Sequence, residues 1–376
     1  MKLDNVHIVI LSSIKWDFLW QRHQIIAQYF SQFTEVTFIE TTGLRNPNVS
    51  KAFERLNRGL TAEKELKNTS KIDNLTILPP IVAPPTYKLF RILNKKLFTP
   101  NLVKKIKKYS QKPIIFITYI PTSTSLFLME QLEPIKTIYD CVLNFENFPG
   151  IPKDIVKTED QLIQKSDVLI VDSRHLHKKH QSKKNPIIQI PAAVNFEHFH
   201  EIYVAEIEST VVKEATYFGG IDHYRFDWEI IEGLLDSGLT VKLIGPAPEG
   251  IPLKHSRLIH HDTIPHHELP AALSSSDVLI LPYKVTEFTK GTFPAKLFEC
   301  FATGKPIVAT ALPDLVHFSD VIEIGEDTES FTSKVLSAIR NDSGEKRNKR
   351  IELAKENSWE VRCKSYKEKL EAVLKI

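Results

Sequence analysis

Lys296 and Glu299 are the two residues whose types and spacing most clearly suggest chemistry. Side chains three residues apart lie on one face of a helix. On such a face a lysine can hold a phosphate group, while a carboxylate accepts hydrogen bonds from the two adjacent hydroxyls of a ribose. The same two residues could also form an ordinary surface ion pair. The elements around them must therefore decide between a ligand site and a solvated helix face.

The segment 277–310 predicts a strand, a loop and a sharply bounded helix. The apolar run 278–281 ends at Pro282, which is typical of a strand buried on both faces of a parallel sheet. The helix that follows is expected to carry Pro294 in its first turn and to end at Gly304. Open α/β sheets bind ligands at the carboxyl ends of their strands, and helix N-termini attract anions. This arrangement predicts a site for a nucleotide diphosphate.

The stretch PAKLFECFATGKPIVAT, from Pro294, resembles the P-x-K-x-x-E-x-x-A-x-G-K-P-V-V-A-T signature of GT-B glycosyltransferases. The resemblance is to group 1, family 4-like bacterial enzymes of exopolysaccharide, capsule and teichuronic acid synthesis. In that family the glutamate binds the ribose and the lysine region faces the phosphates, which implies these roles for Glu299 and Lys296. The donor-binding residues expected here are Gly219, Gly220, Gly245, Thr263, Ile264, Thr292, Lys296, Leu297 and Glu299.

A second segment, TYFGGIDHYRFDWEIIEGLL, resembles the first strand, glycine turn and helix of such a donor domain. Gly219 and Gly220 would let the main chain approach a sugar diphosphate closely, although a tight strand-to-helix connection explains two glycines equally well. The family places the nucleotide base near Thr263 and Ile264. A histidine cluster raises a metal site as an alternative, but GT-B enzymes hold the diphosphate without an obligatory metal, so no metal or other cofactor is expected. Those histidines are His260, His261, His266 and His267.

The segment WDFLWQRHQ resembles the opening loop and helix of the same bacterial group. The resemblance implies an acceptor site with Trp16, Asp17 and Arg22, and Trp20 is a further aromatic residue there. Aromatic rings of this kind can pack on a sugar ring or a lipid carrier. The alternative is plain packing of aromatic residues at the start of a helix.

The segment TIYDCVLNFENFPG resembles a strand and loop whose carboxylates face the cleft between the domains of relatives. The resemblance implies Asp140 and Glu146 as catalytic residues. Leu143 and Asn144 stand where relatives have acidic residues. Asp140 lies on an otherwise apolar strand, so it needs a hydrogen-bond partner if it is buried. That partner could be an acceptor hydroxyl or a structural group.

Charge is distributed unevenly along the chain. The net charge is +3, but the first 110 residues carry 18 Lys and Arg against 8 Asp and Glu. The excess peaks in residues 86–108, where basic and apolar residues interleave in a pattern that predicts helices able to lie on an anionic membrane. The alternative is a pair of surface helices whose apolar faces turn to the core. No nucleic-acid partner is expected, because no recognised binding motif accompanies the charge.

Strands and helices alternate along the chain, which predicts an α/β fold. With the resemblance, this implies a GT-B fold of two Rossmann-like, doubly wound domains facing across a cleft. The expected domains are an acceptor domain at 1–200, a nucleotide-sugar domain at 201–355 and a final helix at 356–376 that crosses back to the first domain. The expected strands are 6–12, 35–40, 75–78, 114–119, 137–142, 168–172, 187–190, 215–219, 241–245, 258–260, 278–281, 307–309 and 321–324.

Length and composition agree with two α/β domains. The chain has 376 residues, of which 42% are hydrophobic, enough for two ordinary cores. Its three cysteines are scattered and form neither a disulfide framework nor a metal-ligand spacing. No stretch approaches the length of a membrane span, and the N-terminus reads as a strand and not as a signal peptide. A cytoplasmic protein at the inner face of the plasma membrane is therefore expected.

The sequence thus predicts a glycosyltransferase that moves a sugar from a UDP-sugar to a lipid-linked or polysaccharide acceptor. The retaining subgroup uses an E-x7-E pair, but Gly291 stands eight residues before Glu299, so the stereochemistry is left open. Two alternatives share the fold. One is a nucleotide-sugar epimerase, and the other is a catalytically degenerate nucleotide- or glycan-binding protein, motivated by Leu143, Asn144 and Gly291.

Overall fold

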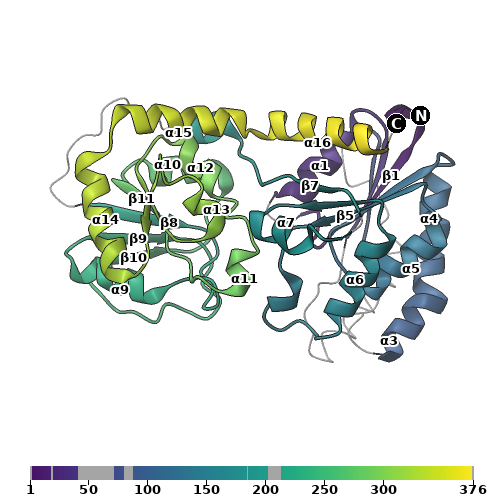
Figure 1. Ribbon diagram of the computed structural model, residues 1–376, viewed down its shortest axis with the longest axis horizontal. Coiled ribbons are helices and arrows are strands. Elements are labelled where there is room, and N and C mark those ends of the chain that lie inside the picture. The colour runs from purple at the N-terminus through teal and green to yellow at the C-terminus, as the bar shows by residue number, and fades with distance from the viewer. Residues whose placement is uncertain are drawn as a thin grey trace. The chain divides into compact units, whose positions relative to one another are not determined.

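The computed structural model describes residues 2–17, 20–40, 72–79, 88–183, 185–201 and 213–374. The chain forms two compact units. Unit 1 comprises Met1–Asp172, Leu176–Ile190 and Cys363–Ile376, and unit 2 comprises Ser173–His175 and Pro191–Arg362. Each unit is built on its own parallel sheet with helices packed on both faces (Figure 1).

The sheet of unit 1 has seven parallel strands in the order β3-β2-β1-β4-β5-β6-β7. Chain order reverses between β1 and β4, so the loops after these two strands flank the point at which doubly wound sheets bind ligands. The strands are β1 (His7–Leu11), β2 (Glu35–Ile39), β3 (Leu75–Leu78), β4 (Ile114–Thr118), β5 (Lys136–Cys141), β6 (Val168–Val171) and β7 (Ile187–Gln189).

Helices cover both faces of this sheet, with α1 and α16 on one side and α4, α5 and α6 on the other (Figure 1). The contact of α1 with α16 includes an edge-to-face pair of Phe30 and Tyr366. The helices are α1 (Arg22–Ser31), α3 (Lys88–Leu93), a π-helix (Asn94–Phe98), α4 (Thr99–Tyr109), α5 (Ser123–Leu132), α6 (Ile155–Lys165), α7 (Arg174–His180) and α16 (Trp359–Leu374). From Cys363 onward, α16 belongs to unit 1.

The sheet of unit 2 has six parallel strands in the order β10-β9-β8-β11-β12-β13. The reversal here lies between β8 and β11, which places the glycine turn after β8 and the loop after β11 at the switch point. The strands are β8 (Glu214–Phe218), β9 (Thr240–Ile244), β10 (Leu258–His261), β11 (Val278–Leu281), β12 (Ile307–Thr310) and β13 (Glu323–Gly325).

Two apolar cores sandwich this sheet. Along β11, Val278 and Ile280 pack into the core shared with α9 and α14, while Leu279 and Leu281 pack into the core shared with α8, α12 and α15. The prediction that this strand is buried on both faces is confirmed. The helices of unit 2 are α8 (Phe196–His200), α9 (Trp228–Asp236), α10 (Leu269–Leu273), α11 (Glu287–Lys290), α12 (Leu297–Ala302), α13 (Pro313–Val316), α14 (Thr328–Asn341) and α15 (Gly344–Glu356).

The strands observed follow the predicted ones, and most of their ends agree to within one residue. The last strand is the exception. β13 begins at Glu323, whereas Val321 and Ile322 precede it and fill the core beside α12. These two residues are apolar because the turn before β13 is buried, and this burial gave them the pattern of a strand. The chain passes into unit 2 at Pro191, because Val194, Phe196 and Phe199 belong to the core of that unit.

Candidate functional site

The side chain of Lys296 lies directly against the glycine turn after β8. Gly219 has φ +131°, a conformation that L side chains rarely adopt, and a Cβ built on it would stand 1.9 Å from Cε and 2.5 Å from Nζ of Lys296. Only a glycine leaves room for the lysine there. The structure thus brings together two residues that the sequence placed in one donor site, although 77 positions separate them.

Gly245, after β9, supports the same turn from behind. Its φ is +141°, and a Cβ there would stand 2.1 Å from the carbonyl oxygen of Gly219. The amide of Gly219 donates to the carbonyl of Ile244 (2.7 Å), and the ring Nε2 of His260 lies 2.9 Å from the carbonyl oxygen of Gly245. Main chain therefore packs against main chain at the carboxyl ends of β8, β9 and β10.

The helix α12 starts later than the sequence indicated. It runs from Leu297 to Ala302, and Lys296 is its N-cap residue, so Pro294 lies before the helix and not in its first turn. The reason is local: the amide of Leu297 donates to the carbonyl of Pro294 (2.9 Å), which closes a four-residue turn ahead of the helix. The predicted end is confirmed, because Gly304 has φ +69° just beyond the last turn. A helix this short makes the two side chains, and not the helix end, the basis of the site.

Burial sets the protonation of the Lys296–Glu299 pair. It raises the pKa of Glu299 to about 7, although the nearby ammonium of Lys296 opposes this. It also lowers the pKa of Lys296, while Glu299 acts in the opposite direction. With a pKa of about 7, the Glu299 carboxyl is partly protonated near neutral pH. A bound anion would favour the charged form of Lys296, because an opposite charge nearby opposes the effect of burial.

Arg225 is a second cation at the turn, which the sequence analysis did not select. Its Nη2 would lie 3.5 Å from a Cβ on Gly220, and its Nε donates to Asp222 Oδ2 (2.7 Å). The positive charge of Arg225 contributes to the lowered pKa of Lys296, so the two cations share one region. The sequence did indicate this residue, because Asp222 and Arg225 form an Asp-x-x-Arg pair that begins two residues after Gly220.

The remaining predicted donor residues differ in what they present. The side chain of Leu297 is fully buried in the core, so only its main chain could contact a ligand. Thr292 is half-buried, and its hydroxyl donates to the carbonyl of Phe288 (3.3 Å). Thr263 is exposed in the loop after β10, and Ile264 packs partly against the core. Gly291 ends α11 and supplies no acidic side chain at that position.

Asp140 and Arg22, predicted for different roles, form one buried ion pair in unit 1. The Arg22 Nε donates to Asp140 Oδ2 at 2.9 Å, and the two side chains are 7% and 0% exposed. The hydroxyl of Tyr366 on α16 donates to the same oxygen at 3.2 Å, and Arg22 Nη1 donates to the carbonyl of Ile190. The two opposite charges can be buried because each neutralises the other. The catalytic role of Asp140 and the acceptor-binding role of Arg22 stay predictions.

Glu146 remains accessible in the loop after β5. Lys179 Nζ donates to Glu146 Oε2 (2.9 Å) and to Asn144 Oδ1 (2.8 Å). Asn144 in turn donates to Asn147 Oδ1 at 3.0 Å. Asn144, at a position where the resemblance implies an acid, thus accepts a hydrogen bond from Lys179, the lysine that pairs with Glu146. Of the two predicted catalytic carboxylates, Glu146 is the one that solvent reaches.

The aromatic residues after β1 divide between core and surface. Trp16 is 9% exposed and packs edge-to-face on Phe38, with ring centroids 5.1 Å apart. The packing on Phe38 agrees with the alternative of plain aromatic packing, and an acceptor contact of Trp16 stays a prediction. Trp20 is 52% exposed, and Asp17 is also exposed.

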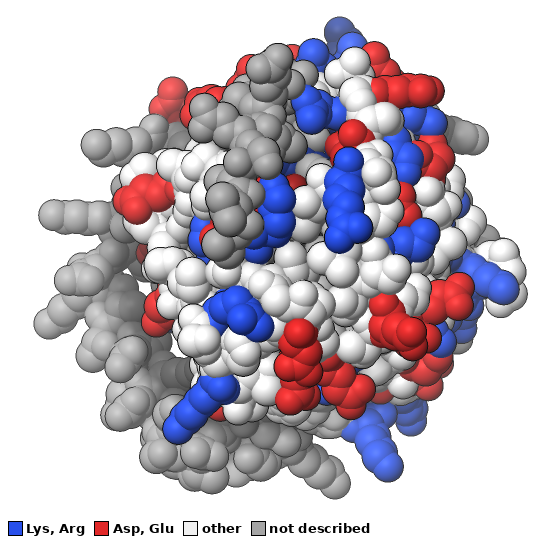
Figure 2. Space-filling view, turned by 90° about the vertical axis from the view of Figure 1, so that its left-hand side faces the viewer, with Lys and Arg blue, Asp and Glu red and all other residues white. Residues whose placement is uncertain are grey.

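The basic stretch at residues 86–108 contains one helix that packs on the core and two that expose apolar side chains. In α4 the apolar residues Leu102, Val103 and Ile106 are buried in the core of unit 1. In contrast, α3 and the π-helix leave Leu89, Ile92 and Leu97 exposed by 65%, 46% and 51%. Residues 86 and 87 of the predicted range lie outside the described part of the chain. On unit 2, the face that carries α14 intersperses both signs of charge (Figure 2).

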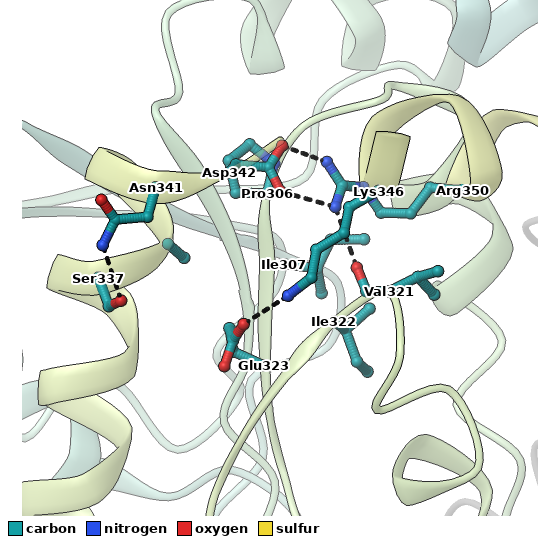
Figure 3. A pocket seen from close by; sticks show the side chains of 11 residues that line it. Pro306, Ile307, Val321, Ile322, Glu323, Ser337, Asn341, Asp342, Lys346 and Arg350 are labelled. Carbon is teal, nitrogen blue, oxygen red and sulfur yellow. Dashed lines mark hydrogen bonds and ion pairs between the residues drawn. The ribbon is translucent and has the colours of Figure 1, made fainter. Parts of the chain in front are cut away.

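A buried arginine anchors the far end of α12. Arg350 on α15 is 1% exposed, forms an ion pair with Asp342, and donates to the carbonyls of Gly304 (2.9 Å) and Val321 (3.0 Å). Figure 3 shows it beside Lys346, which reaches toward Glu323 from the same helix. Because Gly304 ends α12, this arginine fixes the helix that carries Glu299.

Comparison with known proteins agrees with this geometry. Residues 229–341, from α9 to the end of α14, match the family model "Glycosyl transferases group 1", and this range contains Lys296 and Glu299. The resemblance to group 1 glycosyltransferases of GT-B fold is confirmed. A curated relative, TuaH of Bacillus subtilis (strain 168), is 27% identical over 177 residues, 43% of this chain. The chain spans 44% of the length of that relative, whose name describes a teichuronic acid biosynthesis glycosyltransferase.

Solved structures share the fold across almost the whole chain. Sucrose-phosphate synthase from Thermosynechococcus elongatus has a TM-score of 0.69 at 15% identity, covering 98% of this chain and 99% of its own. HepE from Anabaena, in complex with UDP and glucose, has a TM-score of 0.68 at 12% identity, covering 97% and 99%. A glycosyltransferase from Rickettsia africae has a TM-score of 0.66 at 14% identity, covering 99% of both chains. The predicted fold class, α/β with doubly wound GT-B domains, is confirmed.

Proposed function

We propose that this protein is a glycosyltransferase that moves a sugar from a nucleotide diphosphate sugar, with UDP as the nucleotide, to a lipid-linked or polysaccharide acceptor of cell-surface glycan synthesis. The group 1 match over residues 229–341 supports the transferase activity. The UDP and glucose held by HepE, and the teichuronic acid role in the name of TuaH, support the donor and the acceptor class.

The observation that carries this proposal is the placement of Lys296 across Gly219, with Glu299 on the same helix. In sugar transfer the diphosphate leaves with a growing negative charge. Cations already in place around that charge lower the barrier, since they need no reorganisation. Lys296 and Arg225 are the cations at this turn, and Glu299 would hold the ribose so that the sugar is positioned for attack.

Deprotonation of the acceptor hydroxyl requires either a protein base or an oxygen of the donor phosphate. Glu146 is our candidate for the protein base, because it is exposed, whereas Asp140 is closed off by Arg22 and Tyr366. Asp140 then acts as a positioning residue that fixes the end of β5, from which the loop with Glu146 starts. Asp17 and Trp20 are the accessible candidates for contacting the acceptor.

One observation favours a second candidate function, a nucleotide- or glycan-binding protein without transfer activity. Gly291, Leu143 and Asn144 stand at positions where relatives carry acids, and the structure supplies no acidic side chain from those positions. Such a protein would bind UDP but leave every donor intact.

Incubation of the purified protein with a panel of UDP-sugars, with and without a membrane lipid extract, tests these functions. A glycosyltransferase consumes one UDP-sugar, releases UDP, and does so only when the extract supplies an acceptor. An epimerase converts the sugar without the extract. A binding protein does neither, and that outcome with well-folded protein would contradict transfer.

We further propose that α3 and the π-helix contact an anionic membrane surface, which would bring the protein to a lipid-linked acceptor. Leu89, Ile92 and Leu97 are exposed there, and Lys95 and Lys96 lie between them in the sequence with exposed side chains. Apolar side chains beside lysines suit the boundary between headgroups and acyl chains. In the described part of the chain, no helix has the length and hydrophobicity needed to cross a membrane.

A further inference from the structure

Three potential metal ligands from three separate elements meet inside unit 1. Cys141 ends β5, Glu159 lies in α6 and His180 ends α7. Their ligand atoms all lie within 4.8 Å of one another, and all three side chains are buried. Among the described residues this is the one such grouping, and it is separate from the proposed donor site in unit 2. We propose that Cys141, Glu159 and His180 bind a zinc ion.

The spacing of the ligand atoms fits a tetrahedral ion. Zinc binds thiolate sulfur at about 2.3 Å and carboxylate oxygen or imidazole nitrogen at about 2.0–2.2 Å, so neighbouring ligand atoms stand roughly 3.5 Å apart. The Sγ of Cys141 lies 3.6 Å from Oε1 of Glu159. The ligand nitrogen of His180 lies within 4.8 Å of the other two ligand atoms, so a side-chain rotation that moves it by about 1.3 Å or less completes the set. Three protein ligands leave one position for a water molecule.

The surroundings explain why a cation belongs there. The cluster lies in an apolar core that includes Phe145, Leu162 and Leu176. Cys141 and Glu159 place two acidic groups in this core beside His180. A divalent ion with one thiolate, one carboxylate and one neutral imidazole has no net charge, so it removes the cost of two buried acids.

The ligand types select zinc among the common ions. Thiolate and imidazole suit zinc, whereas magnesium and calcium prefer sites made only of oxygen atoms. The Tyr139 hydroxyl donates to Glu159 Oε1 at 2.7 Å, which orients the carboxylate as an outer hydrogen-bond partner would. The ion would join β5, α6 and α7 at the base of the loop that carries Glu146.

Cobalt titration of the full-length protein, after treatment with a chelator, tests this proposal. Cobalt(II) is the probe because a cysteine thiolate bound to it gives a charge-transfer absorption that histidine or carboxylate ligands do not. The wild-type protein should show this absorption, saturating at one equivalent, and zinc should displace it. Cys141→Ser should abolish it, whereas Cys300→Ser and Cys363→Ser, which alter the other two buried thiols, should retain it.

Two further variants test the other ligands. Glu159→Gln and His180→Gln should each weaken zinc binding, measured by competition with a chromophoric chelator, by more than about a hundredfold, beyond the loss of an outer-shell partner. Cobalt binding to the wild-type protein without a thiolate band would assign the metal to exposed histidines and overturn the proposal. So would an unchanged band in Cys141→Ser. The wild-type result stands by itself even if a variant does not fold.

Discussion

Adding a single methyl group at Gly219 should displace the side chain of Lys296 from the turn. Gly219→Ala would place a Cβ 1.9 Å from Cε of Lys296. The end of a lysine is flexible, so we expect the fold to survive while the ammonium moves away. UDP affinity, measured by calorimetry, should fall by about 1–3 kcal/mol, the range for a lost charge-assisted hydrogen bond.

Gly238→Ala is the matched control for this variant. Gly238 also has positive φ, +96°, but nothing lies within 4 Å of the position of its Cβ. It should therefore show backbone strain of about 1–2 kcal/mol in stability and unchanged UDP affinity. Wild-type UDP affinity in Gly219→Ala would show that the position of Lys296 does not matter for binding.

The two carboxylates near β5 should respond differently to neutralisation. Glu146→Gln should lower turnover by at least about a hundredfold with donor affinity little changed, as expected for loss of a general base. Asp140→Asn leaves Arg22 buried without its counter-charge, so we expect lower turnover together with a loss of stability of about 3–5 kcal/mol. Near-full turnover in both variants would favour proton transfer to the donor phosphate instead of to a protein base.

At the scale of elements, Arg350 determines how firmly α12 is held. Arg350→Met leaves Asp342 buried and unpaired and the carbonyl of Gly304 without its donor. We expect the free energy of opening at the α12 amides, measured by hydrogen exchange, to fall by about 3–5 kcal/mol. Lys349→Met is the control on the same helix: its pair with Asp320 is 53% exposed on both sides, so its loss should cost about 1 kcal/mol or less. Equal effects of the two variants would refute the anchoring role.

The elements themselves were largely predictable from sequence, because apolar periodicity and glycine or proline punctuation are local signals. The bounds of β11 and the end of α12 at Gly304 are examples of correct predictions. The start of α12 was not predictable, since Pro294 is equally compatible with a turn and with the first turn of a helix. The burial of Trp16 was not predictable either, because an aromatic residue after a strand has the same sequence pattern whether it packs on Phe38 or remains exposed. Such choices depend on tertiary contacts.

The same limit applies more strongly to groupings that span the whole molecule. Lys296 and Gly219 were placed in one site only through family resemblance. The Arg22–Asp140 pair joins residues 118 positions apart, and no sequence spacing predicts such a pair. Cys141, Glu159 and His180 fit no local metal motif, because β5, α6 and α7 bring them together only once the sheet has formed.

The exposed apolar side chains of Leu89, Ile92 and Leu97 predict that the whole molecule associates with a membrane. Binding to vesicles with anionic lipid, followed by co-sedimentation, should weaken as salt rises, because screening shortens the reach of the lysine charges. Leu89→Gln with Ile92→Gln should reduce it by about tenfold or more, since each buried apolar side chain contributes roughly 1.5–3 kcal/mol. Val316→Gln, at an exposed apolar residue of unit 2, should leave it unchanged. Binding that ignores both salt and lipid charge would contradict a membrane-facing α3.

Calorimetric titration of UDP at pH 6 and pH 8 tests the central claim most directly. Burial raises the pKa of Glu299 to about 7, so the carboxylate is mostly charged at pH 8 and mostly neutral at pH 6. A charged carboxylate accepts hydrogen bonds from the ribose about twice as strongly as a neutral group. Wild-type affinity should therefore rise with pH by more than that of Glu299→Gln, and the variant should bind about 1–3 kcal/mol more weakly at pH 8. Glu232→Gln, at an exposed glutamate of α9, should behave like the wild-type protein. Unchanged UDP affinity in folded Glu299→Gln at both pH values would contradict the donor site.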